Sequence, residues 1–131
     1  MKTQFIPMTV ALIAAFCASQ IEAANGFTST CTTWSAAGTI LQATCFSIAG
    51  KSINSTLDLN TCFTNTEGML AFETNGNFAA SCSNISHNAG NDAHGDTAYL
   101  GALCANSGGD KFDTAIATST YIGNSNGVLV C

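Results

Sequence analysis

A repeat begins with Phe27-Thr28-Ser29-Thr30-Cys31, which returns 51 residues later as Phe78-Ala79-Ala80-Ser81-Cys82. Further along the chain, residues 40–72 return as residues 99–131, at an offset of 59. Glycines, cysteines, asparagines and apolar residues match in one fixed order, which predicts two copies of one small module. Any site that the module builds is therefore expected twice. The matched pairs include Leu41 and Leu100, Cys45 and Cys104, Asn65 and Asn124, Gly68 and Gly127, and Leu70 and Leu129.

The first 23 residues are typical of a secretory signal. Lys2 gives a positive start, residues 6–18 are almost wholly apolar, and Ala23 is a small residue suited to cleavage. The apolar run is shorter than the ~20 residues that a membrane-spanning helix needs, and the alternative is an uncleaved signal anchor. We expect residues 1–23 to be removed and the mature protein to be secreted into the extracellular space. Residues 24–131 are expected to form one domain, with repeat 1 at about 25–76 and repeat 2 at about 77–131.

Six of the seven cysteines remain once Cys17 leaves with the signal. In a short secreted chain, six cysteines predict three disulfides. Equivalent cysteines of the two repeats are expected to pair alike, so that each module closes its own bridge and one bridge is left over. The predicted pairs are Cys31–Cys45, Cys82–Cys104 and Cys62–Cys131.

Charged residues are scarce, and the net charge is −5. The chain has no arginine, and Lys51 and Lys111 are its only cations beyond the signal. Nucleic acid and anionic lipid both require clustered cations, so neither they nor insertion into a membrane is expected. Asn, Ser, Thr and Gly are abundant, which indicates either many turns or a neutral ligand rich in hydroxyl groups. No residue pattern points to a cofactor.

Alternation of apolar and polar residues predicts an all-β fold. Leu41, Ala43 and Cys45, for example, share one face of a strand whose counterpart lies 59 residues later. Two of the expected strands are entered through turns that end in Gly68 and Gly127. The predicted strands cover residues 39–47, 55–60, 68–72, 98–105 and 127–130.

The remaining segments are expected to be turns and loops. Single helical turns are predicted at residues 62–63 and 121–122, before the hairpins. Repeat 2 is eight residues longer than repeat 1 between its first two cysteines, and the extra residues fall within the polar stretch 84–97. We expect this stretch to be a lengthened loop at a hairpin tip, where insertions cost little.

Several short motifs together resemble the cyanovirin-N family over about residues 25–131. They are Phe27/Cys31, Leu41/Ala43/Cys45, the run Ser55 to Asn60, Asn65/Gly68/Leu70 and Asn77/Phe78/Cys82. The resemblance implies an all-β fold of two pseudo-symmetric halves that exchange strands. It also implies a lectin without enzymatic activity, which binds α1,2-linked mannose of high-mannose glycans at up to two sites. Such a chain is expected to be a monomer or a strand-swapped dimer. The Cys62–Cys131 pair would be an addition to the family pattern.

The resemblance also places two carbohydrate sites on this sequence. Asparagine and carboxylate side chains suit such a site because each can engage two neighbouring sugar hydroxyls, although an ordinary hairpin turn is the alternative. Phe46 stands where the family has a glutamate, and Asn126 replaces an aspartate, so the second site is expected to be weaker. The first site would comprise Asn65, Glu67, Gly68, Asn77, Ser81 and Asn106, and the second Ser29, Thr30, Asn124, Asn126 and Gly127.

The sequence is also compatible with functions other than sugar binding. A secreted structural or host-interaction protein on the same scaffold, with sugar binding lost, is the main alternative, and a secreted hydrolase is a distant one. His87, Asp92, His94 and Asp96 could together ligate a divalent cation, but no rigid element is expected to hold them, so no metal site is predicted.

Two acceptor sequons for N-glycosylation occur in the expected mature chain, at Asn54 and Asn84. Asn54 directly precedes a predicted strand, whereas Asn84 lies in the expected loop. Asn84 is therefore the favoured acceptor.

Overall fold

The computed structural model describes residues 25–89 and 98–131, and the predicted signal at residues 1–23 lies outside them. Two three-stranded antiparallel sheets and two short hairpins make up these residues. One sheet contains β1 (Cys31–Ala37), β2 (Ile40–Phe46) and β3 (Ser52–Asp58), and the other contains β6 (Cys82–Ala89), β7 (Ala98–Ala105) and β8 (Lys111–Ala117). The hairpins are β4 (Phe63–Thr66) with β5 (Met69–Phe72), and β9 (Gly123–Ser125) with β10 (Val128–Val130).

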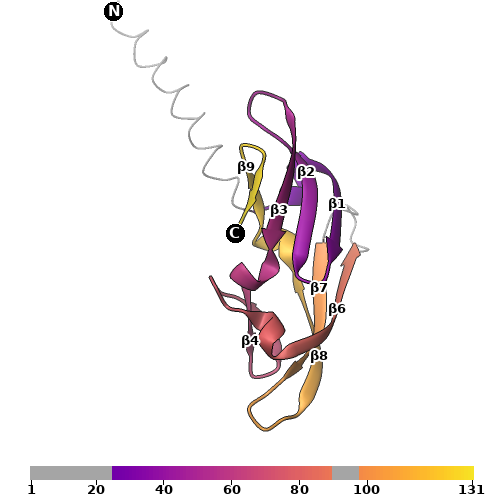
Figure 1. Cartoon of the computed structure of the whole chain (residues 1–131), viewed down its shortest axis with the longest axis vertical. Helices are drawn as coiled ribbons and strands as arrows, with labels where there is room; N and C mark the ends of the chain where they lie inside the picture. The colour runs from indigo at the N-terminus through magenta and orange to yellow at the C-terminus, as the bar shows by residue number, and fades with distance from the viewer. Residues whose placement is uncertain (1–24, 90–97) are drawn as a thin grey trace, which may run out of the picture.

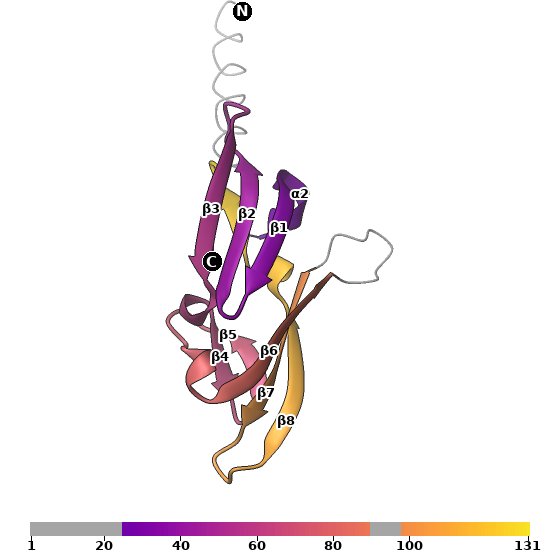
Figure 2. The same ribbon diagram turned by 45° about the vertical axis from the view of Figure 1, so that its right-hand side comes forward.

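Strands are exchanged between the two repeats. The β9–β10 hairpin of repeat 2 packs on the β1–β2–β3 sheet of repeat 1, and the Leu129 backbone N–H donates to Ser55 Oγ at 2.9 Å. Reciprocally, the β4–β5 hairpin of repeat 1 packs on β8 of repeat 2, where the Leu70 N–H donates to Thr114 Oγ1 at 3.1 Å. Figure 1 shows the yellow β9–β10 hairpin beside β3, and Figure 2 shows β4 and β5 beside β6 to β8. The predicted all-β fold with strand exchange is confirmed.

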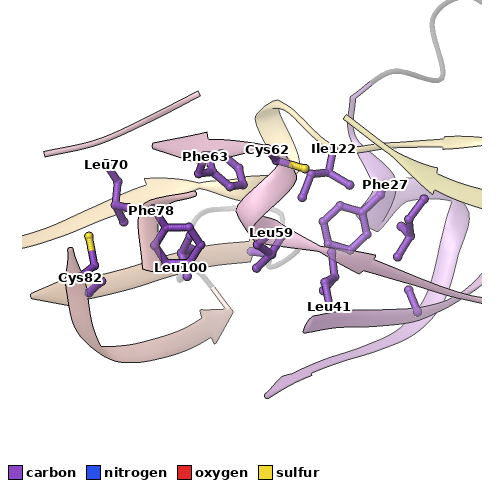
Figure 3. Close-up of a cluster of buried hydrophobic side chains, with 14 of the residues drawn as sticks. Phe27, Leu41, Leu59, Cys62, Phe63, Leu70, Phe78, Cys82, Leu100 and Ile122 are labelled. Carbon is purple, nitrogen blue, oxygen red and sulfur yellow. The ribbon is translucent and has the colours of Figure 1, made fainter. Parts of the chain in front are cut away.

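The hydrophobic core is continuous through both halves and uses equivalent residues of the two repeats. Along β7, Ala98, Leu100 and Ala102 are buried while the residues between them are half-buried, which is the period of two expected for a strand with one face on the core. Phe27 and Phe78, which open the two repeats, are both fully buried. Figure 3 shows both rings within one continuous cluster of buried apolar side chains.

The disulfides join the pairs that the repeat predicts. Cys31–Cys45 and Cys82–Cys104 each link the first two strands of their own sheet. Cys62–Cys131 spans 69 residues and is the one bridge between repeats in the structure. It ties the end of β10 to the segment that leads from the first sheet into β4.

The short helices differ from the prediction. The single turns that precede the hairpins lie at η3 (Leu59–Thr61) and η5 (Thr118–Thr120), a few residues earlier than expected. In η3 the Asp58 carboxylate accepts a hydrogen bond from the Asn60 N–H at 3.0 Å, and this cap fixes where the turn begins. Two further turns, α2 (Phe27–Thr30) and η4 (Phe78–Ala80), were not predicted, and they occupy equivalent positions in the two repeats.

The expected loop at residues 84–97 is partly wrong, because β6 continues to Ala89. Asn84 therefore lies in a strand and not in a loop. His87 also lies in β6, where its Nε2 is 2.7 Å from the carbonyl oxygen of Gly38 in the β1–β2 turn. Asp92, His94 and Asp96 fall outside the described residues.

Residues 25–89 and 98–131 show neither a metal-binding cluster nor a membrane-spanning helix. They contain no group of three or more His, Cys, Asp or Glu side chains placed to hold a metal ion. Over the same ranges, no helix has the length and apolar character required to cross a membrane.

Candidate functional site

The predicted first site is built on the turn between β4 and β5, where Glu67 and Gly68 are the two central residues. Their φ angles are 49° and 95°, so both are left-handed, as a two-residue hairpin turn with the twist of its strands requires. Glycine and asparagine enter this region easily, whereas other residues are strained there by roughly 1–2 kcal/mol. Glu67 is thus an exposed carboxylate on a residue that the turn itself disfavours.

Asn65 fixes this turn from inside. Its Oδ1 accepts a hydrogen bond from the Gly68 N–H at 2.7 Å. Its Nδ2 donates to Ser81 Oγ at 2.8 Å and to the carbonyl oxygen of Ala105 at 2.7 Å. Both amide protons are used within the protein, so Asn65 positions the turn and has no donor left for a ligand. Asn65, which the sequence places in the first site, thus supports the turn from within the protein.

Glu67 is held over the loop that joins β7 and β8. Its Oε1 accepts hydrogen bonds from the Ser107 N–H at 3.3 Å and from Ser107 Oγ at 2.9 Å. Asn106 shapes that loop, because its Oδ1 accepts from the backbone N–H groups of Gly108 at 3.0 Å and Asp110 at 2.9 Å. Within the described residues both contacts of the Glu67 carboxylate use Oε1, which leaves Oε2 for an incoming donor.

An aromatic ring lies directly against the same turn. A β-carbon added to Gly68 would come within 2.4 Å of a Phe112 ring atom, so the ring covers the glycine backbone. Phe112 is nevertheless 46% exposed, and Met69 beside it is 66% exposed. The turn therefore presents a carboxylate flanked by an apolar surface.

The remaining residues of the predicted first site lie at the two ends of η4. Ser81 follows η4 and is linked to the turn through the Asn65 amide. Asn77 precedes η4, with an exposed side chain and a left-handed backbone at φ 55°. Its backbone N–H donates to the carbonyl oxygen of Asn60 at 2.9 Å. Five of the six predicted residues therefore belong to one hydrogen-bonded unit, and only Asn77 lies outside it. The five are Asn65, Glu67, Gly68, Ser81 and Asn106.

The predicted second site repeats this scaffold at the opposite end of the molecule, where the β9–β10 turn meets the β2–β3 loop (Figure 1). Asn124 Oδ1 accepts from the Gly127 N–H at 2.6 Å. Its Nδ2 donates to the carbonyl oxygen of Phe46 at 2.8 Å and, more weakly, to that of Thr30 at 3.4 Å. Asn124, which the sequence places in the second site, is therefore also an internal positioning residue. Thr30 and Ser29 lie exposed in α2 beside this turn.

The exposed groups differ between the two ends. Asn126 takes the place of Glu67, and its Oδ1 accepts from the Ile48 N–H at 2.9 Å. Where the first end has Ala105 and Ser107, the second has Phe46 and Ile48, which are 42% and 53% exposed. The second end therefore has a neutral amide within an apolar rim and no carboxylate on its turn.

Sequence reasoning missed two residues of the first site. Ser107 holds the carboxylate, and Phe112 covers Gly68. The offset of 59 pairs Phe112 with Ile53, whose side chain lies against Gly127 in the same way. The repeat identifies these two as equivalent, but the contact with the turn crosses between repeats, so nothing local in the sequence reveals it.

Comparison with known proteins identifies the fold. The CVNH domain model matches residues 27–131. The NMR structure of a CVNH protein of Gibberella zeae is 30% identical, covers 80% of this chain and 95% of its own, and has a TM-score of 0.71. No curated protein matches the sequence.

Two further solved structures show the same likeness. Microvirin, solved in complex with mannobiose, is 25% identical over 78% of this chain and 94% of its own, with a TM-score of 0.67. A CVNH protein of T. borchii is 27% identical over 80% and 97%, with a TM-score of 0.62. The chain therefore belongs to the CVNH domain family, as the cyanovirin-N motifs of its sequence predicted.

Proposed function

We propose that this protein is a lectin without enzymatic activity that binds a neutral oligosaccharide at the Glu67 end. The observation that carries the proposal is the Glu67 carboxylate, which sits on a left-handed turn residue and is fixed by Ser107. A non-glycine residue kept in a strained backbone conformation indicates a functional requirement for its side chain. The same turn at the other end uses asparagine, which this conformation favours.

The chemistry of the turn suits sugar hydroxyls. A carboxylate accepts from two adjacent hydroxyl groups, and hydrogen bonds to a charged acceptor are stronger than those between neutral groups. Ser107 already fixes Oε1, so a bound sugar would order little of the site. The exposed face of Phe112 can pack against the C–H groups of a sugar ring that Oε2 holds by its hydroxyls.

The ligand class we propose is a mannose-rich glycan met outside the cell. Microvirin, whose fold this chain shares, has been solved with mannobiose, which supports a mannose disaccharide as the first probe. The scarcity of cations, with a net charge of −5, disfavours anionic glycans. Secretion rests on the sequence of residues 1–23. A monomer has one Glu67 site, whereas a strand-swapped dimer has two. The dimer would therefore bind a branched glycan more tightly than the monomer.

A second candidate function is favoured at the opposite end. Phe46, Ile48 and Val128 are 42%, 53% and 50% exposed around the neutral Asn126 turn. Such a rim suits an apolar contact better than sugar hydroxyls. This end is therefore a candidate for interaction with another macromolecule on a scaffold that has lost sugar binding there.

Titration calorimetry with an α1,2-linked mannose disaccharide tests the first proposal. Glu67→Gln keeps the shape of the side chain and removes its charge, whereas Asn126→Ala alters the equivalent turn residue at the other end. We expect the first variant to lose most of the affinity and the second to bind like the unaltered protein. Binding that survives Glu67→Gln, or a glycan array with no signal for the unaltered protein, would overturn the proposal.

A further inference from the structure

The outer face of the β6–β7–β8 sheet carries a wide, open hollow of about 340 Å³. All three strands contribute to it, and its polar side chains are exposed except that of Thr114, which is half-buried. Its lining includes Asn84, Ser86, Asn88, Gly101, Asp113 and Thr114.

The hollow exists because the centre of the sheet lacks a side chain. A β-carbon at Gly101 would lie 2.7 Å from Ser86 Oγ. In the first repeat the equivalent of Gly101 is Gln42, an exposed side chain on the outer face of β2. The corresponding hollow there, which Gln42 lines, measures only about 110 Å³. Replacement of glutamine by glycine therefore opens a space in one sheet that the other sheet fills.

Asn84 stands at the edge of this space and begins the sequon Asn84-Ile85-Ser86. The register of β6 against β7 shifts between Ser83 and Ser86, and Asn84 has φ 52° at this bulge. A bulge redirects a side chain relative to the strand, and Asn84 is exposed. The equivalent residue of repeat 1 is Thr33, which cannot accept an N-glycan. The acceptor asparagine and the empty centre of the sheet thus occur together, and only in the second repeat.

We propose that Asn84 carries an N-linked glycan whose first N-acetylglucosamine lies in the hollow over Gly101. The sugar would be joined to Nδ2 of Asn84, which itself lines the hollow, so the sugar can lie in the hollow directly beside its point of attachment. Asn88 and Asp113 offer hydrogen-bond partners for its hydroxyl and amide groups. Ala115, which pairs with Gly101 in the sheet and is exposed, has a small side chain that leaves room for the acetyl methyl group. The proposal rests on the proposed secretion, because the modification requires the secretory pathway.

Asn54 provides an internal control. It begins the other sequon and lies exposed in β3, where its Oδ1 accepts a hydrogen bond from Thr44 Oγ1 at 2.8 Å. The sheet beside it has Gln42 where the second sheet has Gly101. A glycan at Asn54 therefore has only the smaller hollow of about 110 Å³ beside it, and it should extend into solvent.

The test expresses the full chain, with its own leader, in a eukaryotic secretory host. Mass spectrometry of the secreted protein gives the occupancy of both asparagines, and digestion of the folded protein with peptide N-glycosidase gives the rate of release at each. We expect the Asn84 glycan to be released about tenfold more slowly than in the denatured protein, because the enzyme must wait for the sugar to leave the hollow. Gly101→Gln should abolish that protection, and Gly101→Ala should keep most of it.

A second measurement does not depend on the variants folding. In the unaltered glycoprotein, nuclear Overhauser contacts are expected between the acetyl methyl group and Ala115. A secreted chain with bare Asn84, or a glycan released equally fast from folded and denatured protein and lacking these contacts, would overturn the inference alone. A chain retained in the cell without glycan would overturn proposed secretion as well. Sugar binding at Glu67 is measured separately, on protein from a bacterial host. The outcome at Asn84 therefore neither supports nor contradicts the proposed sugar binding at Glu67.

Discussion

The β4–β5 turn and the β9–β10 turn share one scaffold and present different chemistry. In each, an asparagine side chain accepts from the glycine N–H of the turn and donates to the strand that ends beneath it, from Asn65 to Ala105 and from Asn124 to Phe46. The φ angles agree within a few degrees, at 49° and 95° against 53° and 94°. The first turn exposes a glutamate, and the second an asparagine with an apolar rim.

This difference separates what the fold requires from what a ligand requires. The internal asparagines and the glycines satisfy the turn at both ends, so their presence says little about binding. The glutamate strains its turn, and its link to Ser107 in the β7–β8 loop is one that an asparagine makes to Ile48 at the other end. The presence of a carboxylate therefore needs a further explanation. A ligand that engages the carboxylate supplies one, and it predicts that the two ends respond oppositely to the same substitutions.

The largest expected effect concerns the bridge that joins the repeats. The chain-entropy model gives about 4 kcal/mol for Cys62–Cys131, which closes a loop of 69 residues, and about 3 kcal/mol for Cys31–Cys45, which closes 14. Replacing Cys62 and Cys131 together by serine should therefore lower the free energy of unfolding most. Chemical denaturation of this double variant and of the one that replaces Cys31 and Cys45 by serine shows which loss of stability is larger. If removal of Cys31–Cys45 lowered the free energy of unfolding more, the bridge between the two repeats would not be the one that stabilises the fold most.

The next effect tests whether the two scaffolds are equivalent. Asn65→Ala and Asn124→Ala each remove three hydrogen bonds, one of them to a turn N–H, so each should cost about 3 kcal/mol of stability. Thermal unfolding of the matched pair measures this directly. Ser125→Ala alters an exposed residue of the second turn and serves as the control. If only one of the two substitutions lowered the stability by much less than this, the two turns would not be structurally equivalent.

The third effect separates the ends by function. Glu67→Asn gives the first turn the residue of the second. It should stabilise the fold by about 1 kcal/mol, because asparagine tolerates the left-handed conformation and the hydrogen bonds to Ser107 that are lost are exposed to solvent. It should also weaken binding of the mannose disaccharide by about 2 kcal/mol, or roughly thirtyfold, since the charged acceptor is lost. Denaturation and calorimetry on one preparation give both values. Lower stability together with unchanged affinity would contradict the functional explanation of the strain.

The smallest effect concerns the aromatic surface. Phe112→Ile gives the first end the residue of the second, and it should weaken sugar binding by about 1 kcal/mol. The reverse change, Ile53→Phe, should confer no binding on the second end, because no carboxylate lies beside it. Calorimetry measures both variants. Undiminished affinity of Phe112→Ile would remove the ring from the site and leave the carboxylate as its main feature.

Much of this arrangement could be predicted from the sequence, because a repeat carries tertiary information. The equivalence of Asn65 with Asn124 and of Cys45 with Cys104 follows from matched spacing, and strand alternation gives the sheets. The internal role of Asn65 could not be predicted, since its partners Ser81 and Ala105 belong to the other repeat.

Strand β6 shows a second limit of sequence reasoning. Polar residues from Asn84 onward indicate a loop, yet β6 pairs with β7 through Ala89 and opposite Ala98. One face of this sheet is exposed to solvent, so Asn, Ser and His can occupy positions in the strand. These polar residues hide the alternation of apolar and polar residues by which a strand is recognised in the sequence. The backbone pairing outweighs the local composition there.

The most direct measurement is a titration of isotopically labelled protein with the mannose disaccharide, followed residue by residue in nitrogen–proton correlation spectra. The backbone amides of Glu67, Gly68 and Ser107 should shift progressively and saturate, while those of Asn126, Gly127 and Ile48 stay in place. Equal shifts at both ends, or shifts confined to the Asn126 end, would contradict the assignment of sugar binding to the strained carboxylate.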